Sequence, residues 1–135
     1  KLDCTSLEYE YHKADFKEYS LLLIDSNVKH TLLTSGYNDR RNEVEQGLAI
    51  IKKHYPSVKN FRDCYESQLD KIKEEMSELL FKRCHFVINE IRRVNEAVVA
   101  LDENDFKNLG KLMYETHEGL SNDYEVSCAE LNFLG

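Results

Sequence analysis

The start of the chain alternates apolar and polar positions with the two-residue period of a β-strand. Tyr9 and Tyr11 face one way and Glu10 faces the other, which predicts a half-buried strand over about residues 6–12. A nearly continuous apolar run then predicts a more buried strand over about residues 19–25. We therefore expect an antiparallel β-hairpin. Two strands are rarely stable alone, so the hairpin should complete a larger sheet.

The apolar positions of the remaining chain follow the period of an α-helix. The most regular stripe runs from Leu80 to Leu101, while the opposite face carries charged residues, including Arg83, that we expect to face solvent. Ser127 and Glu130 form the capping box of a last helix. The pattern predicts an α+β fold in a single partial domain over residues 1–135, in which the hairpin precedes four or five helices. The helices are expected over about residues 38–55, 65–77, 79–101, 104–118 and 128–134.

The composition is that of one acidic domain and excludes several classes of function. The chain has 135 residues, 41% of them hydrophobic, and a net charge of -7, so it offers no electrostatic footprint for nucleic acid or an anionic membrane. No apolar run approaches the ~20 residues of a membrane span, and no signal-peptide pattern is present. The cysteines lack any CxxC pair and predict reduced, mostly buried thiols in a cytoplasmic protein. They are Cys4, Cys64, Cys84 and Cys128.

No catalytic motif can be recognised locally, but three stretches carry polar side chains at suitable places. Lys29 follows the predicted buried strand, where it can meet a phosphate or a sugar or remain a solvated turn residue. Tyr37, at the start of the first helix, can pack on a pyranose ring or staple the first helical turn. Asp123 and Glu125 form a carboxylate pair, which we expect to satisfy backbone or basic groups rather than to catalyse. We expect no metal site.

Several stretches, in this order, resemble the galactokinase family of the GHMP kinase superfamily. Residues 25–41 are similar to its NVRH…SSEYN.RR stretch, and residues 82–97 to its RRARHVV…EA helix. Residues 110–131, which include the sequence DYEVSCAEL, resemble its GxLM…SH…DYEVSCPEL segment. The resemblance covers essentially the whole chain. Gly36 stands where the family has Glu, and Ala129 where it has Pro.

This resemblance implies an enzyme that transfers the γ-phosphoryl group of MgATP to the C1 hydroxyl of galactose. The chain would form part of the C-terminal domain of a GHMP-type kinase. Tyr37 matches the family's galactose-contacting tyrosine, and Lys29 the basic position near the nucleotide phosphates. The family's catalytic carboxylate and Gly/Ser phosphate loop have no counterpart in this sequence. The resemblance therefore implies an interior piece that contains no catalytic residues, binds no cofactor and is inactive alone.

Two alternatives remain open from the sequence. One is a related sugar kinase that acts on N-acetylgalactosamine or arabinose, and the other is a non-enzymatic, kinase-derived helical binding module. The expected partners are galactose, ATP and the remainder of the same polypeptide. We also expect self-association through apolar surface that lacks its natural cover.

Overall fold

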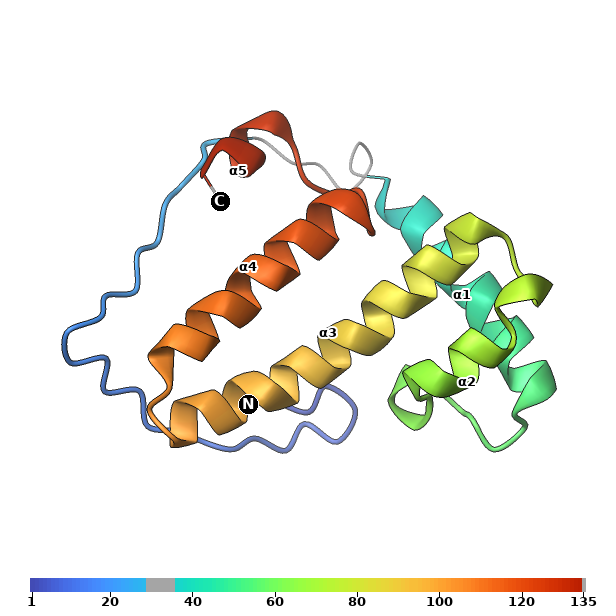
Figure 1. Ribbon diagram of the computed structural model, residues 1–135, viewed down its shortest axis with the longest axis horizontal. Helices are drawn as coiled ribbons and strands as arrows, with labels where there is room; N and C mark the ends of the chain where they lie inside the picture. Colours follow the sequence, from blue (N-terminus) through green and yellow to red (C-terminus); the bar gives the residue numbers. More distant parts are fainter. Residues whose placement is uncertain (29–35, 135) are drawn as a thin grey trace.

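The computed structural model describes residues 1–28 and 36–134, and for Tyr37 the backbone only. Lys29 and the side chain of Tyr37 therefore lie outside the described part of the chain. Figure 1 shows a helical molecule built around one long helix. The elements are α1 (Tyr37–His54), η1 (Phe61–Asp63), α2 (Glu66–Lys71), η2 (Lys73–Glu75), α3 (Glu78–Asp102), α4 (Phe106–Asn122) and α5 (Ala129–Leu134).

The long helix α3 is the scaffold on which the other helices pack. Both views show α1 and α2 beside its N-terminal half, while α4 returns along it from the opposite end. α3 and α4 form a helical hairpin, and a side chain caps the N-terminus of each helix. Ser77 Oγ accepts the Leu80 N–H at 3.2 Å to begin α3, and an Asp105 carboxylate oxygen accepts the Asn108 N–H at 3.0 Å to begin α4.

The main core lies where α1 and α2 meet the N-terminal half of α3. Its centre is fully enclosed, because Ile51, Leu69 and Cys84 have no exposed surface. The other buried members of this cluster are Val58, Cys64, Ile72 and Ile88. Burial of these apolar side chains fixes α1 against α3.

The predicted β-hairpin was wrong: residues 1–28 and 36–134 contain no β-strand. The first residues instead form one isolated antiparallel bridge between Leu2 and Tyr9. It is closed by hydrogen bonds from the Glu10 N–H to the Lys1 carbonyl and from the Asp3 N–H to the Glu8 carbonyl, both at 2.8 Å. A strand needs a neighbour to satisfy its backbone groups. No described segment supplies one to residues 19–25.

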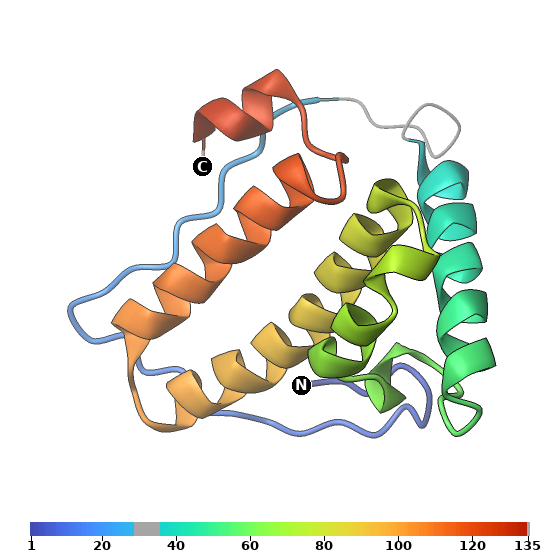
Figure 2. The same ribbon diagram turned by 45° about the vertical axis from the view of Figure 1, so that its right-hand side comes forward.

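The N-terminal segment, residues 1–28, instead runs in extended form around the helical hairpin (Figure 2). Side chains attach it to the helices along the way. Arg62 Nη1 donates to Asp3 at 2.6 Å, His12 Nδ1 lies 2.9 Å from Asp102, and Phe16 packs on Phe106. The apolar run that we expected to be buried is largely exposed, with Leu23 94% accessible.

No helix in the described ranges combines the length and the apolar character that crossing a membrane requires.

Candidate functional site

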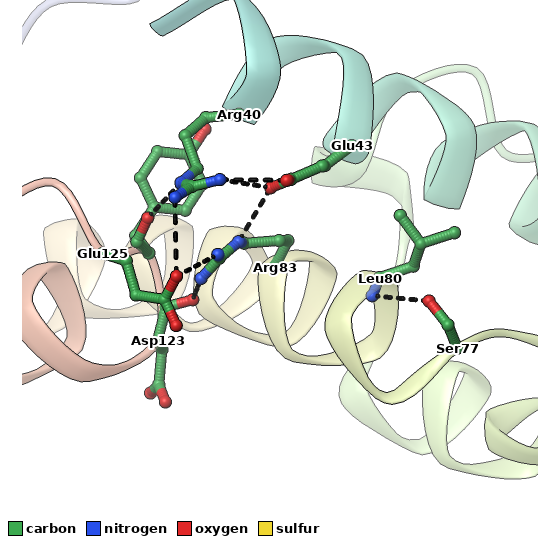
Figure 3. A network of polar contacts seen from close by, with 8 residues as sticks. Arg40, Glu43, Ser77, Leu80, Arg83, Asp123 and Glu125 are labelled. Carbon is green, nitrogen blue, oxygen red and sulfur yellow. Dashed lines mark hydrogen bonds and ion pairs between the residues drawn. The ribbon is translucent and has the colours of Figure 1, made fainter. Parts of the chain in front are cut away.

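A cluster of four charged side chains joins three segments of the chain beside the start of α1 (Figure 3). Arg40 and Glu43 come from α1, Arg83 from α3, and Glu125 from the connection between α4 and α5. We call these four residues the arginine–glutamate cluster. Charges of opposite sign alternate around it.

Each glutamate of the cluster binds both arginines. Arg40 Nη1 donates to the two carboxylate oxygens of Glu43 at 2.9 Å, and Arg83 Nε donates to Glu43 Oε2, also at 2.9 Å. Glu125 Oε2 accepts from Arg83 Nη2 at 2.7 Å and from Arg40 Nη2 at 3.4 Å. Charge-assisted hydrogen bonds of this kind are stronger than neutral ones and fix orientation as well as distance.

The same arginines also bind the backbone of the segment that follows α4. Arg83 Nη1 donates to the Asp123 carbonyl, and Arg40 Nε donates to the Tyr124 carbonyl at 2.6 Å. The Tyr124 ring stacks on Phe86 of α3 with 4.8 Å between centroids. Residues 123–125 are therefore tied to α1 and α3 through backbone, ring and carboxylate at once.

Arg83 is the most deeply buried member of the cluster, with 1% of its surface exposed. A buried charge is costly unless it is paired and hydrogen-bonded, and Arg83 meets this requirement through Glu43, Glu125 and the Asp123 carbonyl. Burial alone would lower the pKa of Arg83, but hydrogen bonds and charge from Glu125 and Glu43 raise it above its usual value. A hydrogen bond from Arg83, together with its charge, lowers the pKa of Glu125. Both groups stay charged at neutral pH.

The burial of Arg83 corrects the prediction that it faces solvent. Arg83 is buried because Glu43 of α1 and the segment 123–125 lie against its guanidinium group. The prediction that the carboxylates at 123 and 125 satisfy basic groups is confirmed for Glu125. At Asp123 the structure instead uses the backbone carbonyl as the acceptor.

The candidate ligand contacts themselves stay predictions. Lys29 and the side chain of Tyr37 lie outside the described residues. The backbone places Tyr37 as the first residue of α1, directly after Gly36, whose φ of 61° is left-handed. The Arg40 N–H donates to the Gly36 carbonyl at 3.0 Å, so the cluster begins within the first turn of α1.

Two further expectations concern cysteines and metals. All four cysteines are free thiols; Cys64 and Cys84 are buried, Cys128 is half-buried, and Cys4 is exposed. Within residues 1–28 and 36–134, no three His, Cys, Asp or Glu side chains are grouped so that they could hold a metal ion.

Comparison with known proteins places this geometry in a wider context. No family model matches the chain. It is 44% identical over 133 residues to the galactokinase of Thermotoga maritima, covering 98% of this chain and 35% of that protein. It is 36% identical over 134 residues to the galactokinase of Clostridium acetobutylicum, covering 98% of this chain and 34% of that protein.

A solved structure is similar over the same length. The crystal structure of Lactococcus lactis galactokinase complexed with galactose matches with a TM-score of 0.88 and 26% identity, covering 98% of this chain and 34% of that one. The chain thus spans about a third of the length of the relatives it matches.

Proposed function

Since this chain is homologous to one segment of the galactokinases, we propose that it works as part of a galactokinase that transfers the γ-phosphoryl group of ATP to the C1 hydroxyl of galactose. The observation that carries the proposal is the 44% identity to a galactokinase over 98% of the chain. The structural match to a galactokinase complexed with galactose supports it independently. The comparisons do not favour the related sugar kinases or the binding module.

Within such an enzyme the chain contributes position rather than reacting groups. Phosphoryl transfer depends on placing the acceptor hydroxyl in line with the phosphate and on stabilising the charge that develops. The proposed contribution of Tyr37 is a contact to galactose at the start of α1, and that of Lys29 is a charge near the phosphates of MgATP. The groups that activate the hydroxyl and cradle the phosphates belong to other parts of the polypeptide.

The direct test uses the full-length protein, purified from a host that lacks galactokinase. ATP-dependent formation of galactose phosphate, followed by ³¹P NMR, should be faster than phosphorylation of N-acetylgalactosamine or arabinose. Preference for one of those sugars would favour a related kinase instead, and no transfer to any of them would favour the binding module. The 135-residue chain alone should give no transfer above a control without protein.

The two proposed contacts are tested separately in the same assay. Tyr37→Phe and Tyr37→Ala should raise the KM for galactose and leave the KM for ATP unchanged. Lys29→Ala should raise the KM for ATP and leave the KM for galactose unchanged. A Tyr37→Ala variant with an unchanged KM for galactose would remove Tyr37 from the sugar site.

A further inference from the structure

We propose that Arg83 is a positioning residue for sugar binding, which acts by fixing the first turns of α1 against α3 and the segment 123–125. This inference rests on the proposed function, because it assigns a kinetic consequence to a contact of the sugar site. Arg83 does not itself contact the substrate. It acts through the elements that it holds.

The geometry supports a role in positioning because Arg83 joins α1, α3 and the segment 123–125 at one point. Its Nε reaches Glu43 of α1, while its Nη1 and Nη2 reach the Asp123 carbonyl and Glu125. Its own backbone is fixed, since the next residue, Cys84, is completely buried in the core. Arg83 thus transmits the rigid position of α3 to two segments at once.

The cluster reaches the predicted sugar contact through the first turn of α1. Arg40 shares Glu43 and Glu125 with Arg83, and its backbone N–H donates to the Gly36 carbonyl. Gly36 has the left-handed conformation from which α1 starts, with Tyr37 as the first helical residue. Movement of Glu43 and Arg40 would therefore move the backbone of Tyr37 as well.

An arginine is required because its planar fork directs several donors at acceptors in different directions. Arg83 uses three nitrogens to reach acceptors on two segments. A lysine keeps the positive charge, but its donors radiate from a single atom and cannot span the same acceptors. Arg83→Lys therefore preserves the positive charge and removes the simultaneous hydrogen bonds to the two segments.

The test measures kinetics of the full-length protein carrying Arg83→Lys, with Arg93→Lys as the matched control. Arg93 lies on the same helix, its side chain is only 12% exposed, and it pairs with Glu90 on the side that faces α4. We expect Arg83→Lys to raise the KM for galactose about five- to tenfold, because small displacements of a binding group cost this much or more. Its KM for ATP should change less than about twofold.

The control and a second variant separate positioning from general stability. Arg93→Lys should lower the melting temperature and leave the KM for galactose unchanged. If Arg83→Lys does not fold, Glu43→Gln decides, because it keeps the shape of the side chain and removes the charge that Arg83 holds. A raised KM for galactose in Glu43→Gln supports the proposal, and an unchanged one overturns it.

The failures of the two proposals are distinguishable. If the unmodified protein does not phosphorylate galactose, the proposed function fails. If it does, but Arg83→Lys and Arg93→Lys change the melting temperature alike and leave both KM values unchanged, the assignment of Arg83 is overturned and the proposed function stands.

Discussion

Gly47 of α1 lies directly against the thiol of Cys84 where α1 crosses α3. A Cβ atom placed on Gly47 would overlap Cys84 Sγ and lie 3.7 Å from the Leu80 carbonyl oxygen. Cys84 has no exposed surface, so its sulfur is confined by the surrounding core. The close approach of the two helices therefore requires a residue without a side chain at position 47.

Gly47→Ala should destabilise the chain by about 1–3 kcal/mol, although alanine favours helices, because the added methyl group overpacks the crossing. Gly110→Ala is the matched control, since it lies inside α4 with nothing within 4 Å of the new Cβ. It should stabilise by about 0.5–1 kcal/mol through helix propensity. Urea unfolding followed by circular dichroism measures both.

A double-mutant cycle assigns the cost of Gly47→Ala to the contact with Cys84. Cys84→Ala removes the sulfur that the new methyl group would meet, so the alanine at 47 should cost less in that background. If the changes in the free energy of unfolding for the two single substitutions add up to that of the double variant, the two positions do not share this contact.

Ser77→Ala should destabilise α3 by about 1 kcal/mol, because Ser77 Oγ accepts the Leu80 N–H that would otherwise lack a partner (Figure 3). Ser77→Asp is the control, since aspartate is an equally good N-terminal cap and should retain most of the stability. Equal losses in both variants would mean that the hydroxyl does more than cap the helix. Urea unfolding midpoints provide the comparison.

The ion pair between Arg83 and Glu125 gives the stability a predictable dependence on pH. The hydrogen bond and charge of Arg83 lower the pKa of Glu125 in the folded chain. A carboxyl group with a lowered folded pKa stabilises fully above its unfolded pKa of about 4.3, and this contribution is lost as pH falls through the folded pKa. The wild-type chain should therefore be more stable than Glu125→Gln at neutral pH, and this difference in stability should shrink in acid.

Urea midpoints of the wild type and Glu125→Gln at pH 7, 5 and 3 test this dependence. The wild type should be the more stable at pH 7 and 5, and the difference should narrow at pH 3. A difference that stays constant across this range would show that the charge of Glu125 does not contribute.

The helices could be predicted from the sequence because their signals are local. The apolar stripe predicted a helix over 79–101, and α3 spans Glu78–Asp102, with Ser77 as its cap. The predicted helix over 65–77 is broken at Ile72 into α2 and the short 3-10 turn η2. A continuous apolar stripe does not reveal where an α-helix ends and a 3-10 turn begins.

Neither the absence of the predicted β-hairpin nor the arginine–glutamate cluster could be predicted in the same way, since both depend on residues that are distant in the sequence. The alternation around Tyr9 signals a strand only if another strand lies beside it, and Leu2 supplies no more than one bridge. The partners of Arg83 lie 40 and 42 positions away, at Glu43 and Glu125. No local pattern distinguishes this arginine from those that face solvent.

The buried thiols should resist modification until the chain unfolds. Burial, with a smaller contribution from the nearby Cys64, raises the pKa of Cys84 to about 12, and burial also raises the pKa of Cys64. Because the thiolate is the reactive form, neither should react with iodoacetamide at pH 8 in the folded chain. Cys4 is exposed and serves as the internal control.

Mass spectrometry of peptides measures the labelling of each cysteine before and after addition of urea. Cys4 should be labelled in both conditions, and Cys64 and Cys84 only in urea. Labelling of Cys84 in the folded chain at the rate of Cys4 would contradict the core described here.

The exposed apolar run in the N-terminal segment should make the isolated 135-residue chain associate. Leu21, Leu22 and Leu23 are 64%, 77% and 94% exposed in an extended stretch that pairs with no described strand. Unpaired, apolar and extended backbone is a template for pairing with another copy. Sedimentation velocity should therefore show a weight-average mass that rises with protein concentration.

Replacing Leu21 and Leu23 by lysine should reduce this association, because charges on an unpaired edge oppose strand pairing. Tyr114→Lys is the control. Tyr114 is 62% exposed on α4, so this substitution adds a positive charge away from the N-terminal segment. It should leave the association unchanged. A wild-type chain that stays monomeric at every concentration would show that this apolar run does not drive contact between copies. Association that Tyr114→Lys abolishes as completely would place the contact on α4 instead.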